Sequence, residues 1–230
     1  MDKKKFIRKL GISAADERAI KEKVTELEKR TNGEIALAIV KQSDTYSALE
    51  LTVAACCTFV LGAVFVIFAG PIQTLLSPLD WMPSASRFAS TFLVFTAAVF
   101  IVSFLLLNVG TIERVFIPKS LRLANTKRRA YFHFFESGLY KTKGRSGILI
   151  FVSVLERTVI VFADEGINAK VDQSAWNTVC SDLVQSLKHK KAGTGFITAV
   201  EQCGEILANS FPAKAVNPNE LPDGLVVLER

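Results

Sequence analysis

The chain has 230 residues, half of them hydrophobic, and a formal net charge of +6. This length allows one or two domains, and the mean hydropathy of +0.30 is too high for an ordinary soluble composition. The positive charge lies beside the apolar segments, where anionic lipid attracts it, so it favours a lipid surface over nucleic acid.

The first predicted elements are a helix and a strand. Ser13 has the position of a helix N-cap with Asp16 and Glu17 in the first turn, and the helix should end near residues 31–33. The aliphatic run 34–40 is typical of a strand. Because one strand is not stable alone, its hydrogen-bonding partners must follow later in the chain.

Two long apolar segments come next, at about residues 51–76 and 88–112. A helix of roughly 20 apolar residues crosses the hydrocarbon core of a bilayer, so each is long enough to span it. A buried helix of a soluble core would show a polar stripe, whereas Thr, Ser, Asn and Gln are only scattered here. The sequence therefore predicts a transmembrane hairpin over 48–112.

Basic residues are unevenly distributed around this hairpin. The link between the spans holds one basic residue, Arg87, whereas the segments on either side are rich in Lys and Arg. The positive-inside rule then places both termini in the cytoplasm. Trp81, in the link, suits an aromatic anchor at the outer interface or a buried position in the loop.

A helix is predicted over 118–138, with a basic start and an aromatic end. We expect the basic start to lie on the membrane surface, because each such charge near anionic lipid contributes about 1 kcal/mol. The residues assigned to this surface are Lys119, Arg122, Lys127, Arg128 and Arg129.

The remaining sequence predicts two strands and two helices. The strands cover 147–155 and 158–163 with a polar turn at Glu156 and Arg157, and the helices cover about 172–190 and 195–210. Residues 1–47 and 113–230 would share one sheet, interrupted by the hairpin. The expected fold class is therefore α/β, in one discontinuous domain.

Several catalytic motifs are absent. The sequence has no dinucleotide fingerprint, no phosphate-binding Gly-Lys-Ser/Thr loop and no His-Glu-x-x-His. What remains is carboxylates: Asp164 and Glu165 follow a strand, and Asp172 starts a helix. Carboxylates at the end of a strand in an open α/β sheet often hold a ligand or a hard cation, but a polar turn and a helix cap also explain them.

The order of several motifs resembles the TPM domain family, in the branch of bacterial membrane proteins with a transmembrane hairpin inside the domain. The resemblance covers nearly the whole chain outside the spans. The motifs are Thr31-Asn32-Gly33-Glu34-Ile35, residues 145–153, Val161-Phe162-Ala163-Asp164-Glu165-Gly166-Ile167, Phe211-Pro212 and Asn219-Glu220-Leu221-Pro222-Asp223.

The resemblance implies a discontinuous α/β sandwich, with helices flanking a central sheet, in a protein of the bacterial inner membrane. It also implies one of several roles: acid phosphatase activity, calcium or magnesium binding, or assembly or regulation of membrane complexes. Soluble members usually carry Asp-Asn-Gly before the central strand, whereas this chain has Lys143-Gly144-Arg145 there. Asp164 and Glu165 occupy the family's matching position after the next strand and are carried over as metal ligands, with Asp172 added from the sequence pattern.

Two main functions follow as expectations, and lipid sensing through the basic helix is a third hypothesis. The leading hypothesis is a non-catalytic module that requires no cofactor and binds a membrane-protein partner from the cytoplasmic side. The alternative is a phosphatase in which Asp164, Glu165 and Asp172 hold a divalent ion that activates water.

Overall fold

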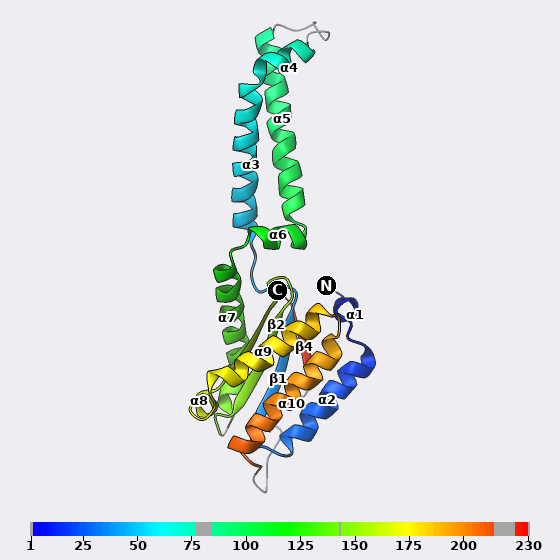
Figure 1. Ribbon diagram of the computed structural model, residues 1–230, viewed down its shortest axis with the longest axis vertical. Coiled ribbons are helices and arrows are strands. Elements are labelled where there is room, and N and C mark those ends of the chain that lie inside the picture. The colour runs from blue at the N-terminus through cyan, green and yellow to red at the C-terminus, as the bar shows by residue number, and fades with distance from the viewer. Residues whose placement is uncertain (1, 77–83, 143, 214–223, 230) are drawn as a thin grey trace. The chain divides into compact units, whose positions relative to one another are not determined.

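The computed structural model describes residues 2–76, 84–142, 144–213 and 224–229 (Figure 1). The chain divides into two compact units, which are described separately. The α/β unit consists of Met1–Asp44 with Ser120–Arg230, and the hairpin unit is Thr45–Lys119. Trp81 and the tail motif 219–223 lie outside the described residues.

The α/β unit is built on a four-stranded sheet of order β3-β2-β1-β4. Strand β1 (Glu34–Val40) pairs in parallel with β2 (Gly147–Ser153) and with β4 (Leu225–Leu228), and β3 (Thr158–Ala163) runs antiparallel to β2. The predicted strands at 34–40, 147–155 and 158–163 are thereby confirmed, and the first does pair with sequence beyond the hairpin. The sequence did not predict β4.

Four helices cover one face of this sheet (Figure 1). They are α1 (Lys3–Lys9), α2 (Ala14–Glu28), α9 (Gln173–Lys188) and α10 (Ala192–Ser210). Aliphatic side chains of these helices and of alternate positions in β1 and β2 form the main core, as the two-residue period of a strand requires. The fold class expected from the sequence is confirmed.

The predicted start of α2 is confirmed by its cap. The Ser13 hydroxyl accepts a hydrogen bond from the Asp16 backbone N–H at 3.1 Å, and Asp16 Oδ2 accepts one from the Ser13 N–H at 2.7 Å. This reciprocal pair satisfies two of the backbone donors that a helix N-terminus leaves free.

The other face of the sheet has much less cover. It is packed by α7 (Lys119–Glu136) and by the single turn η2 (Leu139–Lys141), which enclose a small second core containing Phe134, Leu139 and Phe151. Ile160 and Phe162, on β3, are only partly buried against it. One helix therefore packs where several pack on the opposite face.

The hairpin unit contains α3 (Ser47–Ile67), α4 (Ala69–Leu76), α5 (Ser84–Leu107) and α6 (Gly110–Phe116). Helices α3 and α5 pack through the Phe65 ring, whose centroid lies 4.8–5.8 Å from those of three phenylalanines of α5: Phe88, Phe92 and Phe95.

The limits expected for the two apolar segments need correction. The first helix ends at Ile67, not near residue 76, and α4 is a separate helix. Pro71 lies four residues beyond Ile67 and has no backbone N–H to bond its carbonyl, which favours a break there. The second helix ends at Leu107, and α6 starts at Gly110.

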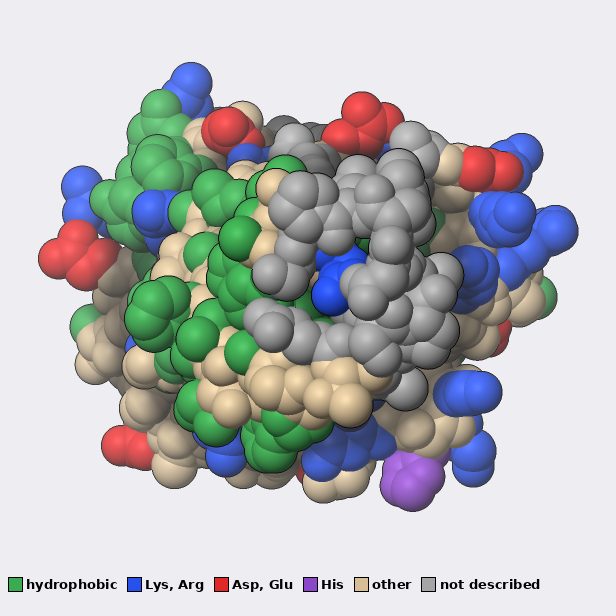
Figure 2. Space-filling model, turned by 90° about the horizontal axis from the view of Figure 1, so that it is seen from above, with side chains coloured by type: hydrophobic (Ala, Val, Ile, Leu, Met, Phe, Trp, Pro, Cys, Tyr) green, Lys and Arg blue, Asp and Glu red, His purple; other side chains and the backbone are tan. Residues whose placement is uncertain are grey.

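Both long helices are exposed along most of their apolar length. Only 17% of the most apolar part of α3 and 6% of that of α5 is buried. Figure 2 shows hydrophobic side chains, in green, exposed on one face of the molecule. Each helix is thus long and apolar enough to cross a bilayer, and neither is enclosed as a soluble core helix would be.

Candidate functional site

The expected carboxylates follow β3, and the direction of that strand decides where they lie. Because β3 is antiparallel to β2, its carboxyl end lies beside the start of β2, and the Asp164 N–H donates to the Gly147 carbonyl at 2.9 Å. Asp164 is therefore at the amino edge of the parallel strands. The rule that ligands gather at the carboxyl edge of a parallel sheet does not apply to it.

Asp164 acts locally as a helix cap. Its Oδ1 accepts a hydrogen bond from the Glu165 N–H at 2.7 Å, at the start of the short helix α8 (Glu165–Asn168). Its Oδ2 is buried and has no hydrogen-bond partner among the described residues. One acceptor atom of Asp164 therefore stays available to a donor that enters the site.

Glu165 forms an ion pair with Arg145. Arg145 Nη1 lies 2.5 Å from Glu165 Oε2, in an ion pair whose two side chains are largely exposed. The Arg145 backbone has a φ of 45°, a left-handed conformation that is uncommon for a residue with a side chain. The pair is in water, so it orients the two side chains more than it stabilises the fold.

Asp172 has a different role from the other two carboxylates. It caps α9 by accepting a hydrogen bond from the Ser174 N–H at 2.7 Å. Hydrogen bonds from the Ser174 side chain and backbone hold the pKa of Asp172 below its usual value. Asp172 is not among the residues that line the cleft around Asp164 and Glu165.

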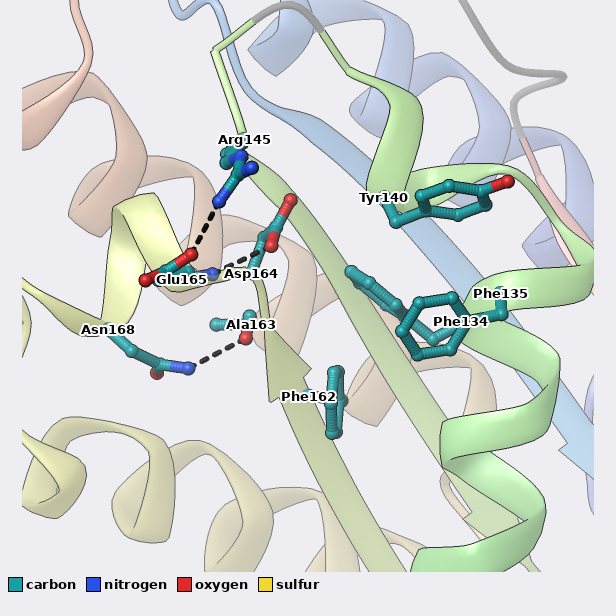
Figure 3. Close-up of a pocket in the computed structure, with 9 residues that line it drawn as sticks. All are labelled: Phe134, Phe135, Tyr140, Arg145, Phe162, Ala163, Asp164, Glu165 and Asn168. Atoms are coloured by element: carbon teal, nitrogen blue, oxygen red, sulfur yellow. Dashed lines mark hydrogen bonds and ion pairs between the residues drawn. The ribbon is translucent and has the colours of Figure 1, made fainter.

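A cleft of about 510 Å³ lies beside Asp164 and Glu165. Figure 3 shows its two sides: aromatic rings from α7, η2 and β3 face the polar residues at the end of β3 and in α8. Asn168 donates from its side chain to the Ala163 carbonyl at 2.7 Å, which fixes the polar side. The aromatic residues of the cleft are Phe134, Phe135, Tyr140 and Phe162.

The aromatic rings are in mutual contact. Phe135 lies 4.6 Å from Tyr131 and 5.2 Å from Tyr140 between ring centroids, and Phe134 lies 4.7 Å from Phe162. Such contacts hold the rings in place and add about 0.5–1.5 kcal/mol per pair beyond area burial. The aromatic side of the cleft is therefore preorganised.

A calcium or magnesium ion in this cleft would need several oxygen ligands around one point. Calcium takes six to eight oxygen ligands and magnesium needs octahedral geometry. Within the described ranges no group of three or more His, Cys, Asp and Glu side chains is placed to hold a metal. Glu165 is already paired with Arg145, whose positive charge opposes a cation. The described residues of this cleft therefore do not fit such an ion.

The five basic residues expected at a membrane surface have different surroundings. Arg128 pairs with Asp44 at 2.5 Å, Arg129 donates to the Glu229 carbonyl at 3.1 Å, and Arg122 is half-buried. Lys127 is exposed, and Lys119 is exposed in the hairpin unit. The set does not form a uniform exposed stripe.

Sequence reasoning missed Arg145 and the aromatic rings as members of this site. One signal was available: Tyr131, Phe132, Phe134 and Phe135 are too closely spaced to share one face of a helix, so some of them had to stay outside the core.

Comparisons with known proteins agree with this architecture. The model of the TPM domain family matches residues 111–206. The NMR structure of the BA42 protein from the psychrophilic bacterium Bizionia argentinensis is similar in fold, with a TM-score of 0.55 and 20% identity over 94% of each chain. No curated protein matches the chain.

Proposed function

We propose that this chain is an integral membrane protein whose α/β unit, which the TPM domain family model matches in part, binds a partner protein of the membrane without catalysing a reaction. The exposed apolar lengths of α3 and α5 support the membrane location. In water these surfaces would be a liability, whereas lipid solvates them.

The proposed topology has both termini in the cytoplasm of a bacterium, with the hairpin in the inner membrane. Its support is the excess of Lys and Arg on both sides of the hairpin over the single Arg87, in the first turn of α5. Alkaline phosphatase, which is active only in the periplasm, should be inactive when fused after Arg230 and active when fused between residues 77 and 83. An active fusion at Arg230 would reverse the topology.

One observation carries the partner-binding proposal. Among the described residues of the α/β unit, seven large hydrophobic side chains are exposed, and six of them belong to α7 and η2. Four of these six are aromatic rings joined by contacts between them, and we call these four the aromatic face: Tyr131, Phe132, Phe135 and Tyr140. Scattered exposed apolar residues are ordinary on a soluble protein, but a concentration on one helix and its following turn indicates a binding surface.

The neighbouring charges indicate what kind of partner fits. The aromatic face is continuous with the cleft through Phe135 and Tyr140, and Asp164 Oδ2 in that cleft lacks a donor among the described residues. A segment with apolar side chains and one Lys, Arg or amide donor would match both features. We therefore assign the surface to an apolar segment of a membrane protein that places one donor at Asp164.

Photocrosslinking in cells tests this assignment. A photoreactive phenylalanine analogue in place of Phe132, which is 54% exposed, should crosslink to one discrete membrane protein. The analogue at Val226, which is 40% exposed and lies on β4, is the matched control and should not. Phe135→Asp should abolish the product from position 132, because a charge at the centre of an apolar contact typically costs several kcal/mol.

Three outcomes would contradict partner binding. Equal crosslinking from positions 132 and 226 would indicate random collision. A product between two copies of this chain would indicate self-association, and products with lipid alone would indicate that the face lies on the bilayer.

A further inference from the structure

A second pocket, of about 460 Å³, lies on the opposite face of the sheet from the aromatic face. Its walls come from the end of α1, the turn between β2 and β3, and the end of α9. This pocket and the first site lie at opposite edges of the sheet. Val152 and Ser153 are the last residues of β2, so the pocket lies at the carboxyl edge of the parallel strands. Ligands are generally bound at this edge in open α/β sheets.

The charged residues of this pocket are all cationic. They are Lys9, Arg157, Lys188 and Lys190, and no acidic residue lines the pocket. In the part of the chain that the structure describes, none of the four forms an ion pair. Glu156 is next to Arg157 in sequence, but its carboxylate accepts from the Ser43 N–H and the Ser153 hydroxyl.

The negative ends of helix dipoles offset only part of this positive charge. Lys9 and Lys188 are in the last turns of α1 and α9, where cations are favourable. Two helix C-termini supply about one negative elementary charge in total. Four cations exceed that, so the pocket keeps a positive excess.

The floor of the pocket is apolar. Leu10, Val154, Val184 and Leu187 line it and are only partly buried against the main core. A site for a free inorganic anion has no need of such a floor, whereas a ligand with a hydrocarbon part would bury it. The partly buried aliphatic side chains and the cations together match a molecule with one anionic end and one apolar end.

Close packing holds the walls of the pocket in place. Arg157 and Lys190 both have left-handed backbones, with φ of 50° and 58°. Gly11 has a φ of 79°, and a Cβ there would lie 2.5 Å from the Lys190 carbonyl oxygen, so the turns after α1 and α9 pack directly on each other. Uncommon backbone conformations of this kind persist only where the surroundings enforce them, and they are frequent at binding sites.

We propose that this pocket binds an anionic amphiphile. Its phosphate or carboxylate group is held by Lys9, Arg157, Lys188 and Lys190, and its hydrocarbon part lies on Leu187 and the neighbouring aliphatic side chains. The molecule is either a free amphiphile or a lipid of the bilayer, which share this chemistry. The inference is independent of partner binding by the aromatic face.

Calorimetric titration of the full chain in nanodiscs of phosphatidylcholine tests the proposal, with octyl phosphate, inorganic phosphate and octanol as probes. Octyl phosphate should bind saturably and at least about tenfold more tightly than either of the other two, since it alone uses both the cations and the floor. Octyl phosphate that binds no better than inorganic phosphate, or no better than octanol, would overturn the proposal.

Charge-reversal variants locate the site. Arg157→Glu and Lys188→Glu should each weaken octyl phosphate binding about thirtyfold, taking about 1 kcal/mol for each unit of charge changed. Lys29→Glu makes the same change at the exposed C-cap of α2 and should leave affinity unaltered. Two positions are tested so that strain at the Arg157 turn does not decide the result. Equal loss in Lys29→Glu would show diffuse charge attraction and contradict a site.

Two further measurements test the role of the apolar floor and distinguish a free amphiphile from a lipid of the bilayer. Leu187→Gln should weaken octyl phosphate and leave inorganic phosphate unaffected; an equal effect on both would contradict the role of the floor. In nanodiscs that contain anionic lipid, weaker octyl phosphate binding identifies a membrane lipid as the occupant. Unchanged affinity identifies a free amphiphile.

Discussion

Residues 120–230 alone should fail to fold. Strand β1 lies between β2 and β4 and pairs with both, so its removal separates the sheet. The removed segment also contains Ile20, Val24, Leu37 and Ile39, which are fully buried. At about 1.5–3 kcal/mol for each such side chain, the loss is comparable to the roughly 5–15 kcal/mol that stabilises a whole domain.

A joined chain that restores the missing segment is the matched control. Residues 1–44 joined to 120–230 by about ten Gly and Ser residues should fold, because such a linker spans roughly 17 Å. The Ser43 and Thr126 hydroxyls are 3.5 Å apart, so the ends to be joined are close. Circular dichroism and urea unfolding compare the two chains. If residues 120–230 alone unfold cooperatively with the same free energy as the joined chain, the first 44 residues do not belong to the same domain as residues 120–230.

Glu156→Ala should lower the free energy of unfolding by about 3 kcal/mol, because it leaves buried donors without acceptors. Glu156 is only 2% exposed. Its Oε1 accepts from the Ser43 N–H at 2.9 Å and its Oε2 from the Ser153 hydroxyl at 2.5 Å. These bonds join the ends of β1 and β2, the two central strands of the sheet.

Two variants control for this effect. Glu156→Gln keeps one acceptor and should cost less than Glu156→Ala, and Glu22→Ala on the exposed side of α2 should change the free energy by less than about 0.5 kcal/mol. Urea unfolding of the joined α/β chain gives all three values. Glu156→Ala that unfolds like Glu22→Ala would mean that the hydrogen bonds are not maintained in solution.

Most of the fold could be predicted from the sequence because short local patterns indicate most of its helices and strands. The run 34–40 is aliphatic and buried at nearly every position, as a central strand requires, and Ser13 with Asp16 fixed the start of α2. Strand β4 has only four residues and pairs with a strand almost 200 positions earlier, so no local signal announced it. Glu156, expected in a polar turn, is buried because its carboxylate satisfies donors of Ser43, shortly after β1, and Ser153, at the end of β2.

The site was only partly predictable. Asp164 and Glu165 were identified, but the cleft depends on rings from α7 that pack across β3, which requires the tertiary structure. The edge of the sheet could have been deduced: the short turn at Glu156 and Arg157 implies an antiparallel hairpin, which places Asp164 at the start of β2. The caps formed by Asp164 and Asp172 agree with the simpler explanation of these carboxylates.

The central claim is that the α/β unit acts by binding and not by metal-dependent hydrolysis. Thermal melting of the full chain with millimolar calcium or magnesium tests this claim most directly. An ion at a hundredfold excess over its dissociation constant adds about 2.7 kcal/mol of stability, which a melting curve reveals. We expect little or no shift and no turnover of a generic phosphate ester, because the cleft's two carboxylates, Asp164 and Glu165, lie beside Arg145, whose positive charge opposes a cation. The contradicting result is a clear shift with metal-dependent hydrolysis, both lost in Asp164→Asn and kept in the exposed control Asp182→Asn.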